Sequence, residues 1–203
     1  MVKLNRDFYD RDALTVAKEL LGEVLVHEID GKKVSAKIVE TEAYMGTEDK
    51  AAHFYNGKRT PRVEIIYGSP GFAYVYLIYG MYHCFNIVTS GKGTPQAVLI
   101  RALQPVGNLE LMARNRYAKP YAQLNRKQIV ELTNGPGKLC RALAIDKRMN
   151  GEDLCSNRLY IEKGGNDIFS IVAAKRVGID YAEEAREYLW RFYIEDNNYV
   201  SVK

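Results

Sequence analysis

The centre of the chain carries three β-prone segments in close succession, and this spacing limits its possible folds more than any other feature. Residues 72–78, 82–89 and 97–103 are rich in β-branched and aromatic side chains, and glycine or proline bounds each of them. The connections are too short for crossover helices, which favours antiparallel pairing. A doubly wound parallel sheet is therefore disfavoured.

Helices and further strands flank this centre. Helical spacing of apolar residues, together with cap residues, predicts helices at 13–21, 109–117, 126–132 and 136–145. Alternating or β-branched segments predict further strands at 23–29, 34–44, 159–161, 170–177, 191–194 and 199–202. Asp30-Gly31 is a strong hairpin signal between the first two of these strands. The polar residues 46–62 are expected to form a loop with one helical turn.

Strands grouped in the middle of the chain with helices at its flanks favour the α+β class. A chain of 203 residues with 47% hydrophobic content can bury one continuous core, and no repeat or linker divides it. We therefore expect a single domain over residues 1–203. The chain has no apolar run of membrane-spanning length, and its N-terminus lacks the apolar core of a signal peptide, so we expect a protein that stays inside the cell.

The cysteines and histidines give no support for a metal site. Cys84, Cys140 and Cys155 are widely spaced and odd in number, which predicts reduced thiols rather than a disulfide framework. The three histidines show no HxxxH spacing, and no CxxC pair is present. We expect no metal and no other cofactor.

Positive charge is concentrated in one part of the chain. The formal net charge is +4, but residues 114–148 alone hold nine basic and two acidic side chains, a local net of +7. Contacts between several of these side chains and phosphates would release counterions and favour nucleic acid binding. A solvated helical face would account for the same pattern.

Two glutamates and a tyrosine share one face of the predicted strand 34–44. The two-residue period places Glu40, Glu42 and Tyr44 together. Burial raises the pKa of a carboxyl group, as acid or base chemistry near neutral pH requires. An exposed strand face with lysine partners across the strand is the ordinary alternative, so the pair alone does not establish a catalytic site.

Four tyrosines fall within nine residues, from Tyr74 to Tyr82. Tyr74 and Tyr76 share a strand face, while the alternation fails at Tyr79-Gly80-Met81, as expected at an exposed hairpin tip. Aromatic faces are suited to stacking on nucleobases, and a protruding side chain is suited to wedging into a duplex. A tyrosine-rich core hairpin would give a similar pattern.

Two short segments are candidate contacts for a nucleic acid backbone. Residues 134–139 form a glycine-rich turn that opens a predicted helix, with Gly137 and Lys138 in its first turn. The spacing is not that of a nucleotide triphosphate loop, but backbone amides at such a helix start can hold one phosphate. Thr60 and Arg62 are a second candidate pair. A plain helix cap would explain the turn equally well.

Taken together, five motifs in register resemble the alkyladenine (3-methyladenine) DNA glycosylase family. The order and spacing match along nearly the whole chain. The motifs are VETEAY at 39–44, DKAAH at 49–53, YVYLIYGMY at 74–82, RAL at 101–103 and GPGKLC at 135–140. The resemblance implies an α+β domain with a curved, mostly antiparallel sheet, similar to the C-terminal domain of methionyl-tRNA formyltransferase.

The resemblance also assigns a binding site for an extruded base. Tyr44 and Tyr76 would sandwich a purine flipped out of the duplex, and His53 would complete the pocket and donate a hydrogen bond to the base or its sugar phosphate. Asn86 would meet the purine edge and help to exclude guanine.

The remaining roles implied by the resemblance concern catalysis and DNA intercalation. Glu42 would hold and deprotonate the attacking water, with Arg101 beside it as a water-positioning group. Tyr79 would fill the gap left by the flipped nucleotide, with Met81 next to it. Loss of a purine passes through an oxocarbenium-like sugar, so one carboxylate can both stabilise the charge and prepare the water.

The expected enzyme is a monofunctional base excision repair glycosylase that acts as a monomer on double-stranded DNA containing 3-methyladenine, hypoxanthine and related lesions. Its expected location is the bacterial cytoplasm, at the nucleoid, rather than a nucleus. Three alternatives remain open: a carbohydrate hydrolase that uses Glu40 with Glu42, a non-catalytic single-strand binding module, and a bifunctional glycosylase with Lys138 as a Schiff base lysine.

Overall fold

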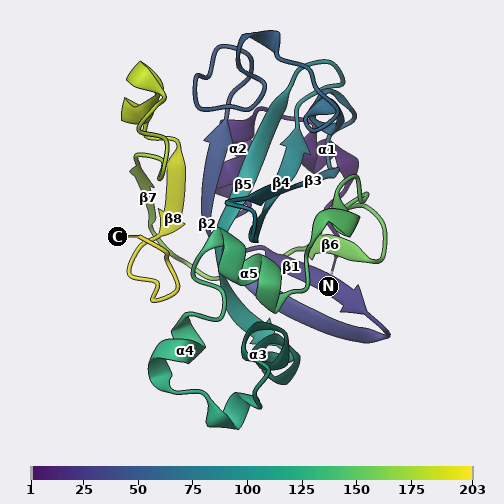
Figure 1. Cartoon of the computed structure of the whole chain (residues 1–203), viewed down its shortest axis with the longest axis vertical. Helices are drawn as coiled ribbons and strands as arrows, with labels where there is room; N and C mark the ends of the chain where they lie inside the picture. The colour runs from purple at the N-terminus through teal and green to yellow at the C-terminus, as the bar shows by residue number, and fades with distance from the viewer. Residues whose placement is uncertain (1, 203) are drawn as a thin grey trace.

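A single antiparallel sheet of eight strands organises the molecule (Figure 1). The computed structural model describes residues 2–202. The main path through the sheet is β3-β4-β5-β2-β1-β6; β8 also pairs with β2, and β7 pairs with β8. The strands are β1 (Val24–Ile29), β2 (Lys32–Tyr44), β3 (Ala73–Ile78), β4 (Tyr82–Thr89), β5 (Gln96–Gly107), β6 (Leu159–Glu162), β7 (Ile171–Ala174) and β8 (Arg191–Ile194).

Short helices cover the sheet and its ends. The α-helices are α1 (Arg6–Tyr9), α2 (Ala13–Glu19), α3 (Leu109–Tyr117), α4 (Arg126–Val130) and α5 (Pro136–Ala142). Single 3-10 turns are η1 (Tyr55–Gly57), η2 (Glu64–Tyr67), η3 (Tyr121–Gln123), η4 (Lys147–Met149) and η5 (Glu183–Glu187). This arrangement confirms the predicted α+β class and the antiparallel pairing.

Strand β2 pairs with three other strands of the sheet. It is 13 residues long and pairs with β1, β5 and β8. The register against β5 shifts on both sides of Glu40, and such irregularities bend a strand and increase its twist. The turn Asp30-Gly31 has positive φ angles of 48° and 73°, as a two-residue hairpin turn requires, so the predicted β1–β2 hairpin is confirmed.

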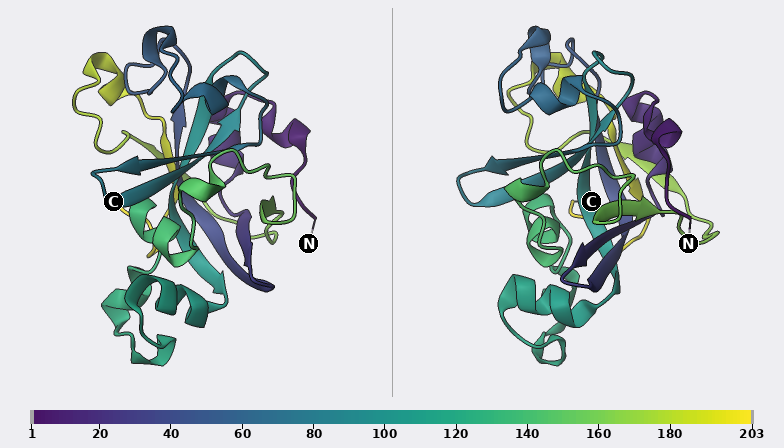
Figure 2. Two further views of the ribbon diagram at one scale, coloured as in Figure 1. Left: turned by 45° about the vertical axis from the view of Figure 1, so that its right-hand side comes forward. Right: turned by 90° about the vertical axis from the view of Figure 1, so that its right-hand side faces the viewer.

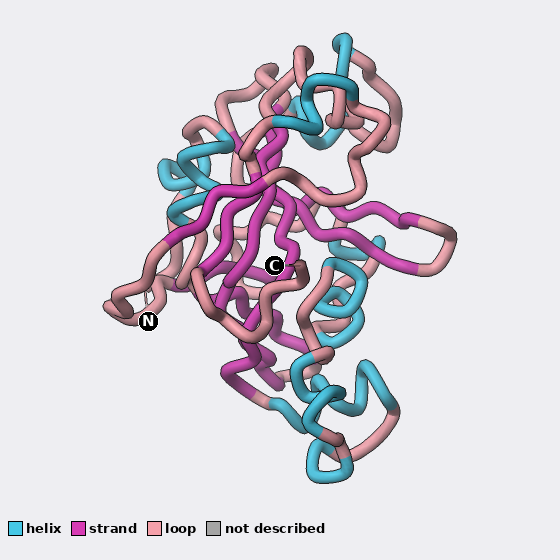
Figure 3. The backbone as a smooth tube through the Cα atoms, turned by 90° about the vertical axis from the view of Figure 1, so that its left-hand side faces the viewer, coloured by secondary structure: helices cyan, strands magenta, loops and turns pink. Residues whose placement is uncertain are grey.

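The β3–β4 hairpin projects from the body of the molecule, on the same side as α5 (Figures 2 and 3). Tyr79 and Gly80 have positive φ angles of 53° and 69°, and the Met81 amide donates to the Ile78 carbonyl at 3.2 Å. Ile78 pairs with Tyr82, so Tyr79, Gly80 and Met81 form the hairpin tip that the break in the alternation predicted. The tip therefore carries its side chains well away from the core.

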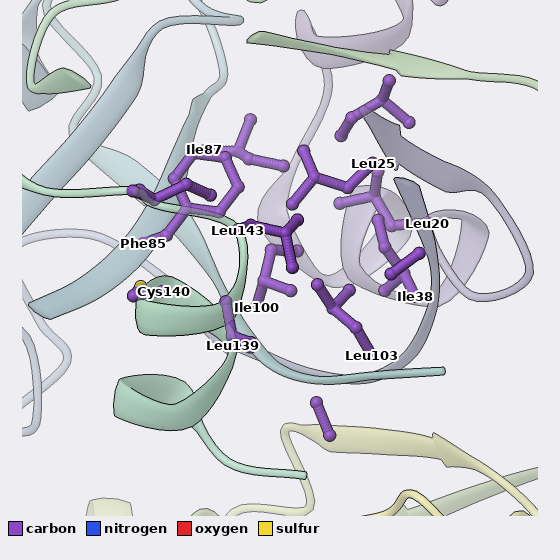
Figure 4. Close-up of a cluster of buried hydrophobic side chains, with 14 of the residues drawn as sticks. Leu20, Leu25, Ile38, Phe85, Ile87, Ile100, Leu103, Leu139, Cys140 and Leu143 are labelled. Atoms are coloured by element: carbon purple, nitrogen blue, oxygen red, sulfur yellow. The ribbon is translucent and has the colours of Figure 1, made fainter. Parts of the chain in front are cut away.

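One large hydrophobic cluster joins the strands to α2 and α5, and Figure 4 shows its centre. Phe85 of β4 and Leu139 of α5 lie on one side of this centre, and Leu25 of β1 lies on the other. All three side chains are fully buried. The core thus packs β4, one of the two strands of the hairpin, against α5.

Most predicted elements are present, with boundaries that differ by a few residues. The predicted strand at 199–202 was wrong, because the backbone there bonds to side chains instead of a neighbouring strand: the Tyr199 amide donates to Asn197 Oδ1 at 2.9 Å and the Ser201 amide to Glu40 Oε2 at 2.7 Å. Helix α1 was not predicted. Within residues 2–202, no helix is long and apolar enough to cross a membrane.

Candidate functional site

A cavity of about 520 Å³ lies between the β3–β4 hairpin, the loop after β2, the start of α5 and the loop after β7. Its lining is mostly apolar and aromatic, with a few polar groups. Eight of the predicted site residues contribute to it: Tyr44, His53, Tyr76, Tyr79, Asn86, Arg101, Gly137 and Lys138. The tertiary structure therefore collects residues from five separate stretches of the sequence around one space.

Glu42 lies directly behind this lining and is fully buried. Its Oε1 accepts the Val177 amide at 2.8 Å and lies 3.2 Å from Arg101 Nη1. Its Oε2 accepts the Tyr44 hydroxyl at 2.9 Å. A carboxylate offers about four lone-pair positions. Among the described residues three donors are present, which leaves a position on Oε2 for one further donor.

Glu40 is also fully buried, but its partners differ from those of Glu42. Its Oε1 accepts from Arg191 Nη1 at 2.9 Å and from Arg101 Nε at 3.3 Å, while Oε2 accepts the Ser201 amide. Arg101 therefore bridges the two carboxylates. The alternative of an exposed face with lysine partners was wrong for both glutamates.

Aromatic rings form two walls of the cavity. The Tyr76 ring lies 4.7 Å from the His53 ring, edge to face, and 5.1 Å from the Tyr74 ring. His53 Nδ1 lies 2.9 Å from the Tyr74 hydroxyl. A guanidinium carbon lies 4.8 Å from the ring centre of each wall tyrosine: Arg62 at Tyr76, and Arg176 at Tyr44. Neither arginine lines the cavity, whereas both tyrosines do.

Burial controls the protonation of this lining. It lowers the pKa of His53 to about 4, and the nearby positive charge of Arg62 contributes to the shift, so His53 is neutral at neutral pH. Burial also raises the pKa of Tyr76 and of Tyr44 well above the ordinary value. The walls are therefore uncharged rings that keep their hydroxyl protons.

Asn86 and Cys84 also line the cavity. Asn86 is 3% exposed, and its Nδ2 donates a hydrogen bond to the Tyr74 carbonyl at 3.1 Å. The side-chain oxygen of Asn86 does not take part in this hydrogen bond. Cys84 lies nearby, and burial raises the pKa of its thiol. Both side chains come from β4, two residues apart and therefore on the same face. This part of the lining thus presents the amide of Asn86 and the uncharged thiol of Cys84.

The rim carries exposed aromatic and apolar side chains. Tyr79 is 79% exposed and Met81 is 67% exposed, both at the hairpin tip. Tyr181, in the loop after β7, lines the cavity and is 67% exposed. Large apolar side chains that stay in solvent often mark a contact surface.

Of the four residues predicted to contact a nucleic acid backbone, Gly137 and Lys138 line the cavity, whereas Thr60 and Arg62 do not. Thr60 and Arg62 lie in the loop before η2, and the Thr60 carbonyl accepts the amides of Val63 and Glu64. Lys138 Nζ donates to Asn134 Oδ1 at 2.9 Å. A Cβ on Gly137 would lie 2.8 Å from the Tyr82 ring, so glycine at this position allows α5 to approach the hairpin.

Three further residues that contact the site had no predicted role. The Val177 amide bonds Glu42, and Arg176 forms a fully buried ion pair with Asp49. Asp49 could have been found from the sequence, because it belongs to the motif DKAAH at 49–53 that supports the family resemblance. No local sequence pattern indicates the roles of Arg176 and Val177, because their partners Asp49 and Glu42 are more than 120 residues away in the sequence. Within the described part of the chain, no cluster of three or more histidine, cysteine or acidic side chains could hold a metal ion.

Comparison with known proteins identifies the family. Residues 7–198 match the family model described as methylpurine-DNA glycosylase (MPG), and the chain belongs to this family. Members of this class are DNA glycosylases, which are hydrolases of N-glycosyl bonds. The predicted family is thereby confirmed, whereas the likeness to the formyltransferase domain stays a prediction.

Similar proteins come from several bacteria. A protein of Desulfitobacterium hafniense (strain Y51) named "Putative 3-methyladenine DNA glycosylase" is 67% identical over 203 residues, all of both chains. Proteins with the same name from Alkaliphilus oremlandii (strain OhILAs) and Clostridium acetobutylicum are 58% and 56% identical. The first of these two covers 100% of both chains, and the second covers 99% of this chain and 98% of its own. The similarity therefore extends over the full length of this sequence.

Proposed function

We propose that the protein is a monofunctional base excision repair glycosylase that flips an alkylated or deaminated purine out of duplex DNA and hydrolyses its N-glycosidic bond. The observation that carries this proposal is a fully buried carboxylate, Glu42, hydrogen-bonded to the tyrosine that walls an aromatic cavity. The names of the relatives support 3-methyladenine as one substrate. Hypoxanthine and related lesions belong to the same proposal.

The cavity has the size and chemistry for one purine. Its volume of about 520 Å³ lies within the range of small-molecule sites. A base between Tyr44 and Tyr76 would stack on both rings, and each stacked face contributes roughly 1–3 kcal/mol. The Asn86 side chain would meet the purine edge and help to exclude guanine through the exocyclic amine of that base, and neutral His53 would donate a hydrogen bond to the base or to its sugar phosphate.

Glu42 would act on water. The attacking water would donate one proton to Oε2, which accepts only the Tyr44 hydroxyl among the described residues. The water oxygen then bonds the sugar carbon while the glycosidic electron pair leaves with the base. Positive charge develops on the sugar during this step, and a nearby carboxylate stabilises it. Arg101, which bridges Glu40 and Glu42, would hold the carboxylate and the water in position.

The leaving group explains the substrate range. A cationic alkylated purine already departs readily and is attracted to tyrosine faces. A neutral purine such as hypoxanthine needs a proton before it leaves. Extrusion costs a few kcal/mol and is least costly at damaged or mispaired bases, which adds to the selectivity.

The rim would hold the DNA. Tyr79, with Met81 beside it, would enter the duplex through the minor groove and fill the gap left by the flipped nucleotide. Backbone phosphates would be met by Thr60 and Arg62 on one side and by Gly137 and Lys138 on the other. The protein would act as one domain and as a monomer on chromosomal DNA, at the bacterial nucleoid.

Excision from a duplex that contains hypoxanthine or 3-methyladenine tests the proposal. The unaltered protein is expected to release the base and leave an abasic site. Glu42→Gln is expected to bind the lesion but to release the base at least about 100-fold more slowly, the scale of general base catalysis. Full activity of this variant would refute the mechanism. Borohydride should trap no covalent adduct, because an adduct would indicate a lysine Schiff base, for example at Lys138.

A further inference from the structure

Arg176 and Asp49 form an ion pair that is sealed inside the protein beside the cavity. Arg176 Nη1 lies 2.6 Å from Asp49 Oδ2, and Nη2 lies 2.8 Å from Oδ1. Both side chains are fully buried. Burial of two charges is costly, and such a pair is weak evidence for stability by itself.

The pair connects four segments of the chain. The remaining bonds of the Arg176 guanidinium go to the carbonyls of Ala43, at the end of β2, and Ala185, in η5, at 3.0 and 3.2 Å. All four Nη protons thus have acceptors. Asp49 in turn accepts the amides of Met45 and Ala51, at 3.2 and 3.0 Å. The end of β2, the loop that leads to His53, the segment after β7 and η5 all meet at this pair.

Two components of the proposed site depend directly on Arg176. Its guanidinium carbon lies 4.8 Å from the ring centre of Tyr44, which lines the cavity, while Arg176 itself is not part of the lining. The next residue, Val177, donates its amide to Glu42 Oε1 at 2.8 Å. One residue pair therefore supports both the wall on which a base would stack and the carboxylate that would activate water.

We propose that Arg176 and Asp49 are positioning residues that couple the Tyr44 wall to Glu42. The inference rests on the proposed function for its consequence in catalysis, but not for the coupling itself. Lysine cannot replace arginine here, because an ammonium group has neither the planar fork that matches a carboxylate nor the flat face that packs on a ring. Loss of the fork should let Tyr44 and Val177 move, and displacement of a catalytic group by about 1 Å can lower a rate about 100-fold.

The test uses Arg176→Lys and Asp49→Asn in the full chain. Asp153→Asn serves as the matched control, because Asp153 also forms a two-bond pair with an arginine, Arg6, at 2.8 and 2.7 Å, and lies outside the cavity lining. Two properties are measured on the folded fraction of each protein: the single-turnover rate of hypoxanthine release at saturating enzyme, and the hydrogen exchange of the Val177 amide. If Asp49→Asn does not fold, Arg176→Lys, which keeps the positive charge, tests the coupling by itself.

Arg176→Lys is expected to lower the rate of base release about 10- to 100-fold. It should lower the exchange protection of the Val177 amide at least about tenfold. Its affinity for undamaged duplex should stay within about twofold of that of the unaltered protein. The control is expected to change neither property. Unaltered rate or unaltered protection in Arg176→Lys would overturn the coupling. If the unaltered protein releases no base, the proposed function fails, and the exchange measurement still decides whether the pair positions Val177.

Discussion

The Tyr44 hydroxyl donates a hydrogen bond of 2.9 Å to Glu42 Oε2. Tyr44 lines the cavity, while Glu42 lies behind it with no exposed surface. The same side chain is thus a wall of the cavity on its ring face and a partner of the buried carboxylate at its hydroxyl. Contact with a ligand at the ring and the orientation of the carboxylate are consequently linked through one residue.

Tyr44→Phe keeps the ring and removes this hydrogen bond. A hydrogen bond to a charged group contributes about 1.5–3 kcal/mol, so we expect single-turnover excision to slow about 10- to 100-fold. Affinity for lesion-containing duplex should change less than about threefold, because the stacking face is retained. Quench kinetics and equilibrium binding on the same substrate measure the two effects. A rate equal to that of the unaltered protein would show that the hydroxyl does not orient Glu42.

Glu40→Gln should destabilise the fold. Glu40 has no exposed surface and contacts both Arg101 and Arg191, so its neutralisation leaves two buried guanidinium groups with one carboxylate fewer. Removal of one partner from a buried ion pair costs about 3–5 kcal/mol. Urea unfolding monitored by circular dichroism measures the loss. Glu64→Gln, which breaks the exposed pair with Arg59, is the control and should cost no more than about 1 kcal/mol.

Tyr79→Ala tests the hairpin tip. The side chain is 79% exposed, so its removal should leave the unfolding free energy nearly unchanged. Because a wedge acts only where a base pair has been opened, we expect excision from duplex substrate to fall about tenfold or more, and excision from single-stranded substrate to fall less. Leu77→Ala, on the same hairpin and 48% exposed, is the control. Equal losses on both substrates would exclude the wedge role.

Stability should decrease in mild acid. Burial lowers the pKa of His53 to about 4 and lowers that of His27 as well. Both histidines therefore stay neutral in the folded protein while the unfolded chain binds protons below its ordinary pKa near 6.5. The unfolded state gains protons first, so the contribution to stability is present above pH 6.5 and is lost as the pH falls toward 4.

Thermal or urea unfolding at pH 7 and pH 5 measures this effect. The expected loss from His53 is on the order of 1–2 kcal/mol at pH 5, after allowance for its partial exposure. His53→Gln should reduce the pH dependence by a similar amount. If the variant and the unaltered protein lose the same stability between the two pH values, His53 is not the group responsible.

Local patterns in the sequence were sufficient for the strands and the turns. Asp30-Gly31 forms a two-residue turn, and Tyr79-Gly80-Met81 forms the tip of the β3–β4 hairpin, because hairpin geometry depends on a few neighbouring residues. The two-residue period also placed Tyr44 and Glu42 on one face, as their hydrogen bond confirms. The segment at 199–202 was the exception, since its partner, Glu40, is a side chain far away in the sequence.

The family and the residues around the cavity could be inferred from the order of short motifs, but the partners of the charged groups could not. The two-residue period gave Glu40 and Glu42 the same standing, the family motifs singled out Glu42, and the folded sheet shows that the two carboxylates have different partners. Glu40 meets Arg191 and the Ser201 amide, which lie 151 and 161 residues further along the chain, whereas Glu42 meets Tyr44 and the Val177 amide beside the cavity.

The sequence by itself determined the strands, the turns, the family and the aromatic character of the site, because each of these depends on neighbouring residues or on motif order. The tertiary structure decided how the buried charges are paired, with Glu40 between Arg101 and Arg191, and Asp49 beside Arg176. Sheet pairing and the register shifts around Glu40 bring distant charges together, and burial then requires every charge to have a partner. No local pattern specifies that pairing.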